Sequence, residues 1–168
     1  MSCRLFFALW PDNATRAAFC ALQGRLQGGR PVPAANLHLT LAFLGQQPES
    51  LLPVLRALPS RWADFDCLLQ FDQLGYFSRP RIAWTGMRNI PQPLTDLRQS
   101  VLAALAEAGV ALPVHDGFVP HVTLLRDAEQ PQRSGVGAFA WRAQGVVLVE
   151  SVPQAGGSRY RVLCDEGK

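Results

Sequence analysis

The sequence predicts an α+β fold built from largely antiparallel sheets flanked by helices. Strand-like segments outnumber helical ones, and several of them are joined by hairpin-length turns, which favours this class over a doubly wound parallel sheet. The composition supports a real core, because 48% of the 168 residues are hydrophobic and only 17% are charged. That length suits one domain, or two small lobes packed closely together.

The expected elements follow the order β, α, β, α, β, β, α, β, β, β. The first is a strand, since RLFFALW (4–10) is short, aromatic and apolar. Segments 11–29 and 91–109 read as helices because Pro lies near the start of each and Gly at its end. Segment 48–60 is the remaining helix, with Pro53 near its first turns. Further strands are expected at 38–45, 65–77, 81–87, 121–126, 141–151 and 158–164.

Charge and cysteine content indicate where the protein works but say little about the reaction it performs. A net charge of +3 permits an anionic partner without demanding one. Cys3, Cys20, Cys67 and Cys164 show neither metal-ligand spacing nor a disulfide framework, so we expect a cytoplasmic protein. Residues 1–13 contain one basic residue and a short apolar run before a Pro-Asp break, which predicts neither a signal peptide nor a membrane segment. Nothing in the sequence demands a dimer, and we expect a monomer.

Two of the three histidines open nearly identical strand-like segments, HLTL at 38–41 and HVTL at 121–124. They lie 83 residues apart (121 − 38), which is close to half the chain. Each follows a loop that contains proline, and a predicted helix precedes each loop. The pattern indicates an internal duplication, so we expect residues 1–168 to form one domain of two similar, intertwined lobes that share a cleft.

The paired segments also indicate a chemistry. A single His-x-Thr is more often a core histidine bonded to a neighbour, but two copies in such apolar surroundings favour an active site. Two imidazoles serve as general acid and general base in one step, and two hydroxyls hold the oxygens of a phosphoryl group. Such a site suits a strained 2′,3′-cyclic phosphate. Neither a carboxylate cluster near the motifs nor a Walker-type loop is present, so no metal and no cofactor are expected.

HLTLAFLG and PHVTLLR resemble the paired His-x-Thr-x motifs of the two-histidine phosphoesterase superfamily. RLFFAL and LGYFSRPRIAWTGM resemble the first strand and the central hairpin of the RNA 2′,3′-cyclic phosphodiesterases, also described as 2′-5′ RNA ligases. The resemblance implies a bilobal, pseudo-twofold fold with a central cleft. It further implies hydrolysis of a terminal 2′,3′-cyclic phosphate on RNA to a 2′-phosphate. The reverse reaction would join RNA ends, with tRNA halves as candidate partners.

The same resemblance implies roles for individual residues. His38 would protonate the leaving 3′-oxygen, and His121 would take the proton from the attacking water. Thr40 and Thr123 would bind phosphate oxygens.

Arg126, which closes the second motif, would neutralise the phosphate, and the first motif has no matching arginine. Strict alternation from the histidine places Arg126 on the opposite face, so this role requires the strand to end or bulge near Leu125. Phe7, Tyr76 and Trp84 are candidates for stacking a nucleobase, although core packing is the simpler explanation for each of them.

Two other functions stay open at this level. The first is an RNA-end binding module in which the histidines only hold a phosphate, and the second is a phosphodiesterase acting on a small cyclic nucleotide. The presence of both histidines and both threonines favours an enzyme. The motifs do not distinguish between substrates, because each such reaction needs the same four groups.

Overall fold

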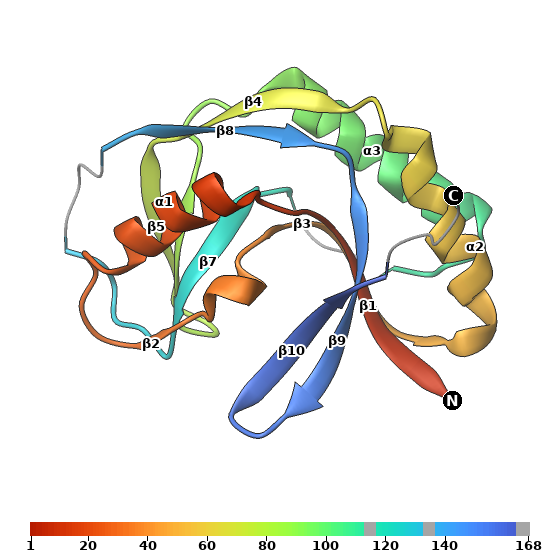
Figure 1. Ribbon diagram of the computed structural model, residues 1–168, viewed down its shortest axis with the longest axis horizontal. Coiled ribbons are helices and arrows are strands. Elements are labelled where there is room, and N and C mark those ends of the chain that lie inside the picture. The colour runs from red at the N-terminus through yellow and green to blue at the C-terminus, as the bar shows by residue number, and fades with distance from the viewer. Residues whose placement is uncertain (113–116, 133–136, 164–168) are drawn as a thin grey trace.

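The computed structural model describes residues 1–112, 117–132 and 137–163, and Figure 1 shows its helices and strands. The α-helices in this part of the chain are α1 (Asn13–Gln23), α2 (Leu52–Ala57) and α3 (Gln92–Glu107). Short 3-10 turns are η1 (Ala34–Asn36), η2 (Glu49–Leu51) and η3 (Leu58–Trp62). The strands are β1 (Ser2–Leu9), β2 (Arg30–Pro31), β3 (Leu39–Pro48), β4 (Asp66–Phe71), β5 (Gln73–Phe77), β6 (Ile82–Gly86), β7 (His121–Arg126), β8 (Phe139–Gln144), β9 (Val147–Gln154) and β10 (Gly157–Val162).

The strands form two sheets, and every pairing is antiparallel, which confirms the predicted α+β class. The larger sheet has the order β10-β9-β1-β3-β7-β6-β5, with β2 also paired to β7. The smaller sheet contains only β4 and β8. Within the larger sheet, one residue pair, Leu39 with Val122, joins β3 to β7. The larger sheet therefore consists of two halves that meet at a single point.

Two segments predicted as single strands, 65–77 and 141–151, are each divided between the two sheets, so those predictions were wrong. Asp72 separates β4 from β5: its backbone N–H donates to the Gly86 carbonyl and its carboxylate accepts the Arg88 N–H. Gly145 separates β8 from β9, and its φ of 69° is a left-handed conformation that glycine adopts without strain. Hydrophobic content continues across both breaks, which is why the pattern alone does not reveal them.

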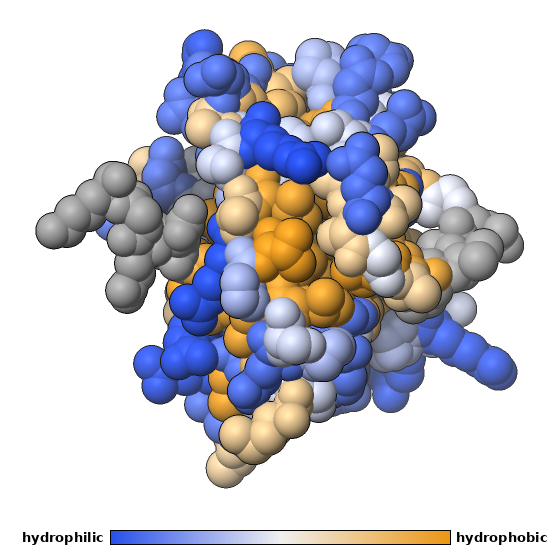
Figure 2. All heavy atoms as spheres, turned by 90° about the vertical axis from the view of Figure 1, so that its right-hand side faces the viewer, coloured by the Kyte–Doolittle hydropathy of each residue, from blue (hydrophilic) through white to orange (hydrophobic). Residues whose placement is uncertain are grey.

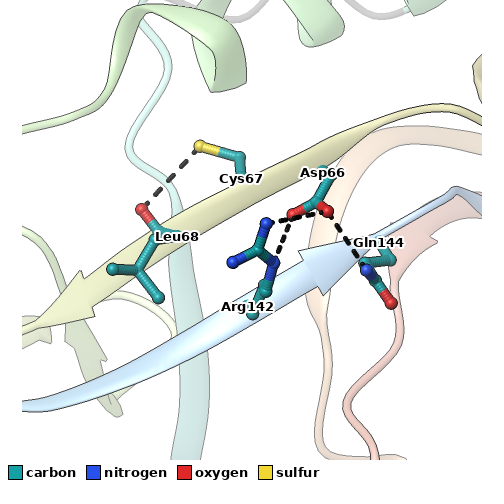
Figure 3. A network of polar contacts seen from close by, with 5 residues as sticks. All are labelled: Asp66, Cys67, Leu68, Arg142 and Gln144. Atoms are coloured by element: carbon teal, nitrogen blue, oxygen red, sulfur yellow. Dashed lines mark hydrogen bonds and ion pairs between the residues drawn. The ribbon is translucent and has the colours of Figure 1, made fainter.

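The smaller sheet has an outer face that carries polar side chains beside the exposed Leu68, and an apolar inner face. Figure 3 shows Arg142 and Gln144 of β8 converging on Asp66 of β4, with Arg142 Nε 2.8 Å and Gln144 Nε2 3.2 Å from carboxylate oxygens. These side chains are exposed, so their ion pair contributes little to the free energy of folding. The inner face carries the alternate residues of β4, which include Leu69 and Phe71. Phe71 packs against Phe19 of α1.

Capping and proline positions explain the observed helix bounds. The Asp12 carboxylate accepts the Thr15 N–H at 2.7 Å and starts α1, which ends at Gln23 rather than near residue 29 as predicted. The predicted helix 48–60 is only α2 between two 3-10 turns, because Pro53 and Pro59 each lack the N–H that an α-helix requires. The predicted helix 91–109 is confirmed as α3. No helix in the described residues is long and apolar enough to cross a bilayer.

The helices lie on one face of the larger sheet and leave the other face open. Leu5, Phe7 and Leu9 of β1 point into the main core, which also contains residues of all three α-helices. The alternate residues Phe6 and Ala8 point the other way, into a small separate cluster with Val149, packed against Trp10, Val147, Tyr160 and Val162. The small cluster forms the floor on which the candidate site is built.

Figure 2 views the side on which α2 lies and shows hydrophobic residues in the middle of it, bordered by hydrophilic ones.

Candidate active site

The two His-x-Thr segments lie side by side at the centre of the larger sheet. Leu39 and Val122, the residues between histidine and threonine in each motif, pair with one another and are fully buried. Alternation therefore turns both histidines and both threonines toward the opposite, open face. A cleft of about 640 Å³ lies there, lined in part by residues of β2 and of the β9–β10 hairpin. Its lining also includes His38, Thr40 and Thr123, whereas His121 is not among the described residues that line it.

Both imidazoles are held in the same way by the chain that precedes them. His38 Nδ1 lies 2.6 Å from the Asn36 carbonyl oxygen, and His121 Nδ1 lies 2.7 Å from that of Val119. A carbonyl only accepts, so each Nδ1 carries hydrogen and donates it, and each Nε2 is left to gain or lose a proton. His38 Nε2 lies 2.8 Å from Thr40 Oγ1, which donates to it when the ring is neutral.

The aromatic surroundings of His38 keep its ring neutral. Phe6 lies 4.8 Å away between ring centroids, Trp10 stacks at 5.8 Å, and Tyr160 meets the ring edge-on at 5.2 Å. Burial among these groups, together with the smaller effects of the nearby His121 and Arg126, lowers the pKa of His38 to about 4, while the hydrogen bond to Asn36 opposes that change. In the ligand-free site at neutral pH this ring is therefore uncharged.

His121 has a related but less complete enclosure. The ring of Phe77 meets it edge-on at 5.1 Å, and Trp84 lies tilted at 5.7 Å. Burial lowers the pKa of His121, while its hydrogen bond to the Val119 carbonyl opposes that change. The site thus presents two imidazoles whose pKa values are both lowered by burial and whose surroundings differ.

A β-bulge turns Arg126 toward the cleft. Thr123 pairs with Trp84 while Leu125 pairs with Ala83, so Leu124 is an extra residue in β7. The bulge that the sequence requires for Arg126 is thus present, one residue before Leu125. Arg126 is exposed and lines the cleft.

The cleft is electropositive. The described residues that line it include three arginines, Arg4, Arg30 and Arg126, and neither aspartate nor glutamate. Arg30 is paired with Asp127 at 2.6 Å, whereas Arg4 and Arg126 form no ion pair within the described residues. Such a surface attracts anions. Within the same residues there is no group of three or more His, Cys, Asp or Glu side chains arranged to hold a metal ion.

The aromatic residues singled out from the sequence do not offer a stacking surface in the cleft. Phe7 is fully buried on the core face of β1, so the structure contradicts its assignment to base stacking. Tyr76 packs against the core and donates its hydroxyl to the Ala128 carbonyl. Trp84 is 8% exposed and supports His121 instead. The aromatic residues that do line the cleft, which sequence reasoning missed, are Phe6, Phe43 and Tyr160.

One wall of the cleft is tied directly to His38. Asn36 accepts the His38 Nδ1–H on its backbone carbonyl and donates its side-chain amide to the Ser158 carbonyl of β10 at 2.8 Å. Arg16 donates to the carbonyl of Ala34 in the same short turn at 2.9 Å. The orientation of the imidazole therefore depends on the position of the β9–β10 hairpin. This link joins residues 122 positions apart, so no local pattern reveals it.

Replacing Gly75 with alanine is expected to disturb the support of His121. A Cβ at this position would overlap the Cζ2 and Cε2 atoms of Trp84, so the indole must move. We expect the free energy of unfolding to fall by about 1–3 kcal/mol in urea titrations, because the site is overpacked. The matched control is Gly137→Ala, whose added Cβ meets nothing within 4 Å. Equal stability of the two variants would contradict the assigned role of Gly75.

Comparison with known proteins places the chain among related sequences and structures. A family model described as the 2′-5′ RNA ligase superfamily matches residues 10–152. The RNA 2′,3′-cyclic phosphodiesterase of Escherichia coli K12 is 37% identical over 115 residues, covering 68% of this chain and 65% of that protein, just under two thirds of its length. The protein of the same name from Thermus thermophilus is 34% identical over 173 residues, covering 95% and 87%.

Solved structures agree with the sequence comparison. The crystal structure of Escherichia coli LigT with 3′-AMP superposes with a TM-score of 0.81 at 33% identity, covering 97% of this chain and 96% of that one. The crystal structure of TT0787 from Thermus thermophilus gives 0.81 at 31% identity, covering 95% and 94%. The bilobal two-histidine phosphoesterase fold predicted from the motifs is therefore confirmed.

Proposed function

Because the chain belongs to the 2′-5′ RNA ligase superfamily, we propose that it hydrolyses the 2′,3′-cyclic phosphate at the end of an RNA strand and leaves a 2′-phosphate. One observation carries this proposal: Leu39 and Val122 pair, so strand alternation turns both His-x-Thr motifs toward the face on which the electropositive cleft lies. The names of the relatives point to the same activity.

The proposed reaction uses the two histidines at opposite ends of one displacement. A water molecule attacks phosphorus, and His121 Nε2 accepts its proton as the new P–O bond forms. The P–O3′ bond breaks, and protonated His38 gives its Nε2 proton to the leaving oxygen. The products are a 2′-phosphate and a free 3′-hydroxyl.

The remaining polar groups of the site bind the phosphate in this proposal. Thr40 and Thr123 hydroxyls donate to non-bridging oxygens, and the Arg126 guanidinium balances their charge. When Thr40 turns to the phosphate it releases His38 Nε2, which lies 2.8 Å from its oxygen in the free site.

The same groups in the same roles would also perform ligation, with His121 taking the proton of the attacking hydroxyl and His38 protonating the leaving 3′-oxygen. A 5′-hydroxyl then replaces water, and two RNA ends are joined, with the halves of a cleaved tRNA as one candidate pair. A single chain supplies all four groups, so we also propose that the protein acts as a monomer. Cys3, Cys20 and Cys67 are free thiols, which supports the proposal of a reducing, cytoplasmic setting.

An oligoribonucleotide that ends in a 2′,3′-cyclic phosphate tests the proposal when it is incubated with the protein in the presence of EDTA. We expect complete conversion to the 2′-phosphate, identified by chromatography against both monophosphate standards. A 3′-phosphate product would show that the 2′-oxygen leaves instead. Absence of turnover combined with tight binding of the oligonucleotide would favour a binding module, and loss of turnover only when EDTA is present would show that a metal takes part.

A further inference from the structure

The strands that carry the two motifs, β3 and β7, each have a bulge after the threonine, but the residues that follow the bulge differ. In β3, Thr40 pairs with Ala8 while Ala42 pairs with Phe7, so Leu41 is an extra residue after the threonine. This matches the bulge at Leu124 in β7. Counting from each histidine, Phe43 therefore occupies the position in the first half that Arg126 occupies in the second.

A cation accompanies Phe43 although the first motif has no arginine of its own. The guanidinium carbon of Arg4 lies 5.0 Å from the centroid of the Phe43 ring, and both residues line the cleft. Arg4 pairs with Ser151 on one side and Gln46 on the other, so no acidic residue stands next to it in the sheet. It forms no side-chain hydrogen bond or ion pair within the described residues, and its charge is available to a ligand.

The position of Arg4 limits which anion it meets. It lies four residues along β1 from Ala8, the partner of Thr40, a separation of about 13 Å at the rise of a strand. A cyclic mononucleotide carries one phosphate, which the histidines, threonines and Arg126 already engage in the proposed reaction. A second cation at this distance suits a second anion, and an RNA strand supplies one at each internucleotide linkage.

We propose that Arg4 and Phe43 bind the nucleotide that precedes the terminal one, with Arg4 on its internucleotide phosphate and its base against the 37% exposed Phe43 ring. This inference rests on the proposed function and specifies its substrate. The preferred substrate is an RNA end of at least two nucleotides, and a free cyclic mononucleotide lacks one of the groups that the cleft holds.

The test compares kcat/KM for adenosine 2′,3′-cyclic phosphate with that for the dinucleotide ApA ending in the same cyclic phosphate. For the wild type we expect the dinucleotide to be preferred by about tenfold or more, the effect of one hydrogen bond to a charged group. Arg4→Gln should bring this ratio close to one, and Phe43→Leu should lower it less. The dependence of KM for the dinucleotide on salt should also become shallower in Arg4→Gln, by about one unit of logarithmic slope.

The control variant is Arg61→Gln, which removes an exposed arginine that pairs with Glu107, residues that do not line the cleft. It should retain the wild-type ratio, and thermal melts should show that all variants are folded. A wild-type ratio near one, or an equal loss on both substrates in Arg4→Gln, would overturn the subsite. Turnover of the cyclic-phosphate oligoribonucleotide by the wild type would still support the proposed function in that case, so the two failures are distinguishable. A third substrate, ADP-ribose cyclic phosphate, carries a diphosphate, and a loss confined to it would also overturn the assignment to RNA.

Discussion

Replacing either His38 or His121 with asparagine is expected to lower kcat for the cyclic-phosphate oligonucleotide by about a thousandfold or more. Asparagine keeps an amide N–H where each Nδ1 donates to its backbone carbonyl, but it lacks the Nε2 atom that exchanges protons. The change therefore removes the proton transfer while preserving the local hydrogen bond. Single-turnover kinetics on the labelled oligonucleotide measures the effect.

The double variant makes this test more specific. Acid and base act in the same displacement, so removing both should cost little more than removing one. Binding of the uncleaved substrate should change far less than kcat, because the threonines and Arg126 remain. Full turnover by either single variant, with Arg61→Gln as the unaffected control, would contradict the two-histidine mechanism.

Acidification is expected to destabilise the protein because His38 is held neutral in the folded state. Its pKa is about 4 when folded and near 6.5 when unfolded, so between these values the unfolded chain binds the extra proton. The stabilising effect of a neutral His38 is therefore complete above pH 6.5 and is lost as the pH falls toward 4. The difference corresponds to roughly 3 kcal/mol.

Urea unfolding of the wild type and of His38→Asn between pH 7 and pH 4 isolates this contribution. The wild type should lose stability more steeply than the variant over that interval. His121 has a lowered pKa as well and destabilises both proteins in the same direction, so the slope of the variant should be reduced and not abolished. Parallel curves for the two proteins would contradict a buried, neutral His38.

The low pKa of His38 also bears on the order of events in the proposed reaction. A general acid must carry a proton, yet this ring is neutral in the free site at physiological pH. The phosphate anion of the substrate favours the protonated form once it lies beside the ring. Substrate binding and protonation of His38 are therefore coupled, because His38 becomes the general acid only after the phosphate lies beside it.

The central features of the site could be predicted from the sequence because they are local. Alternation places the histidine and threonine of each motif on one face of a strand, and the presence of two copies predicts that both pairs share one site. For Arg126 to reach the phosphate, the strand had to end or bulge near Leu125, and the structure has a bulge at Leu124. The fold class followed from the number of strand-like segments and the short turns between them, and helix α3 followed from an unbroken helical repeat.

The parts that sequence reasoning missed depend on pairings between distant strands. Phe7 was assigned to the wrong face because alternation gives two faces to β1 without saying which one opens on the cleft, and Phe6 is the residue on that side. Tyr160 reaches His38 only because β10 and β9 continue the sheet beyond β1. Phe43 faces the cleft because of the bulge at Leu41. The proposed chemistry needs no residue at this position, so it gave no reason to expect that bulge.

The pair Leu39 and Val122 has a consequence for how such a protein diverges. These two fully buried side chains hold the motifs together, and neither faces the cleft. The spacing of the imidazoles thus depends on the core, whereas Arg4 and Phe43, which line the cleft, lie apart from that pair. Substitutions at the rim of the cleft are therefore expected to leave the distance between the two imidazoles unchanged. A substitution at Leu39 or Val122 that changes the size of the side chain is expected to displace both His-x-Thr motifs, because these two residues form the pair between β3 and β7.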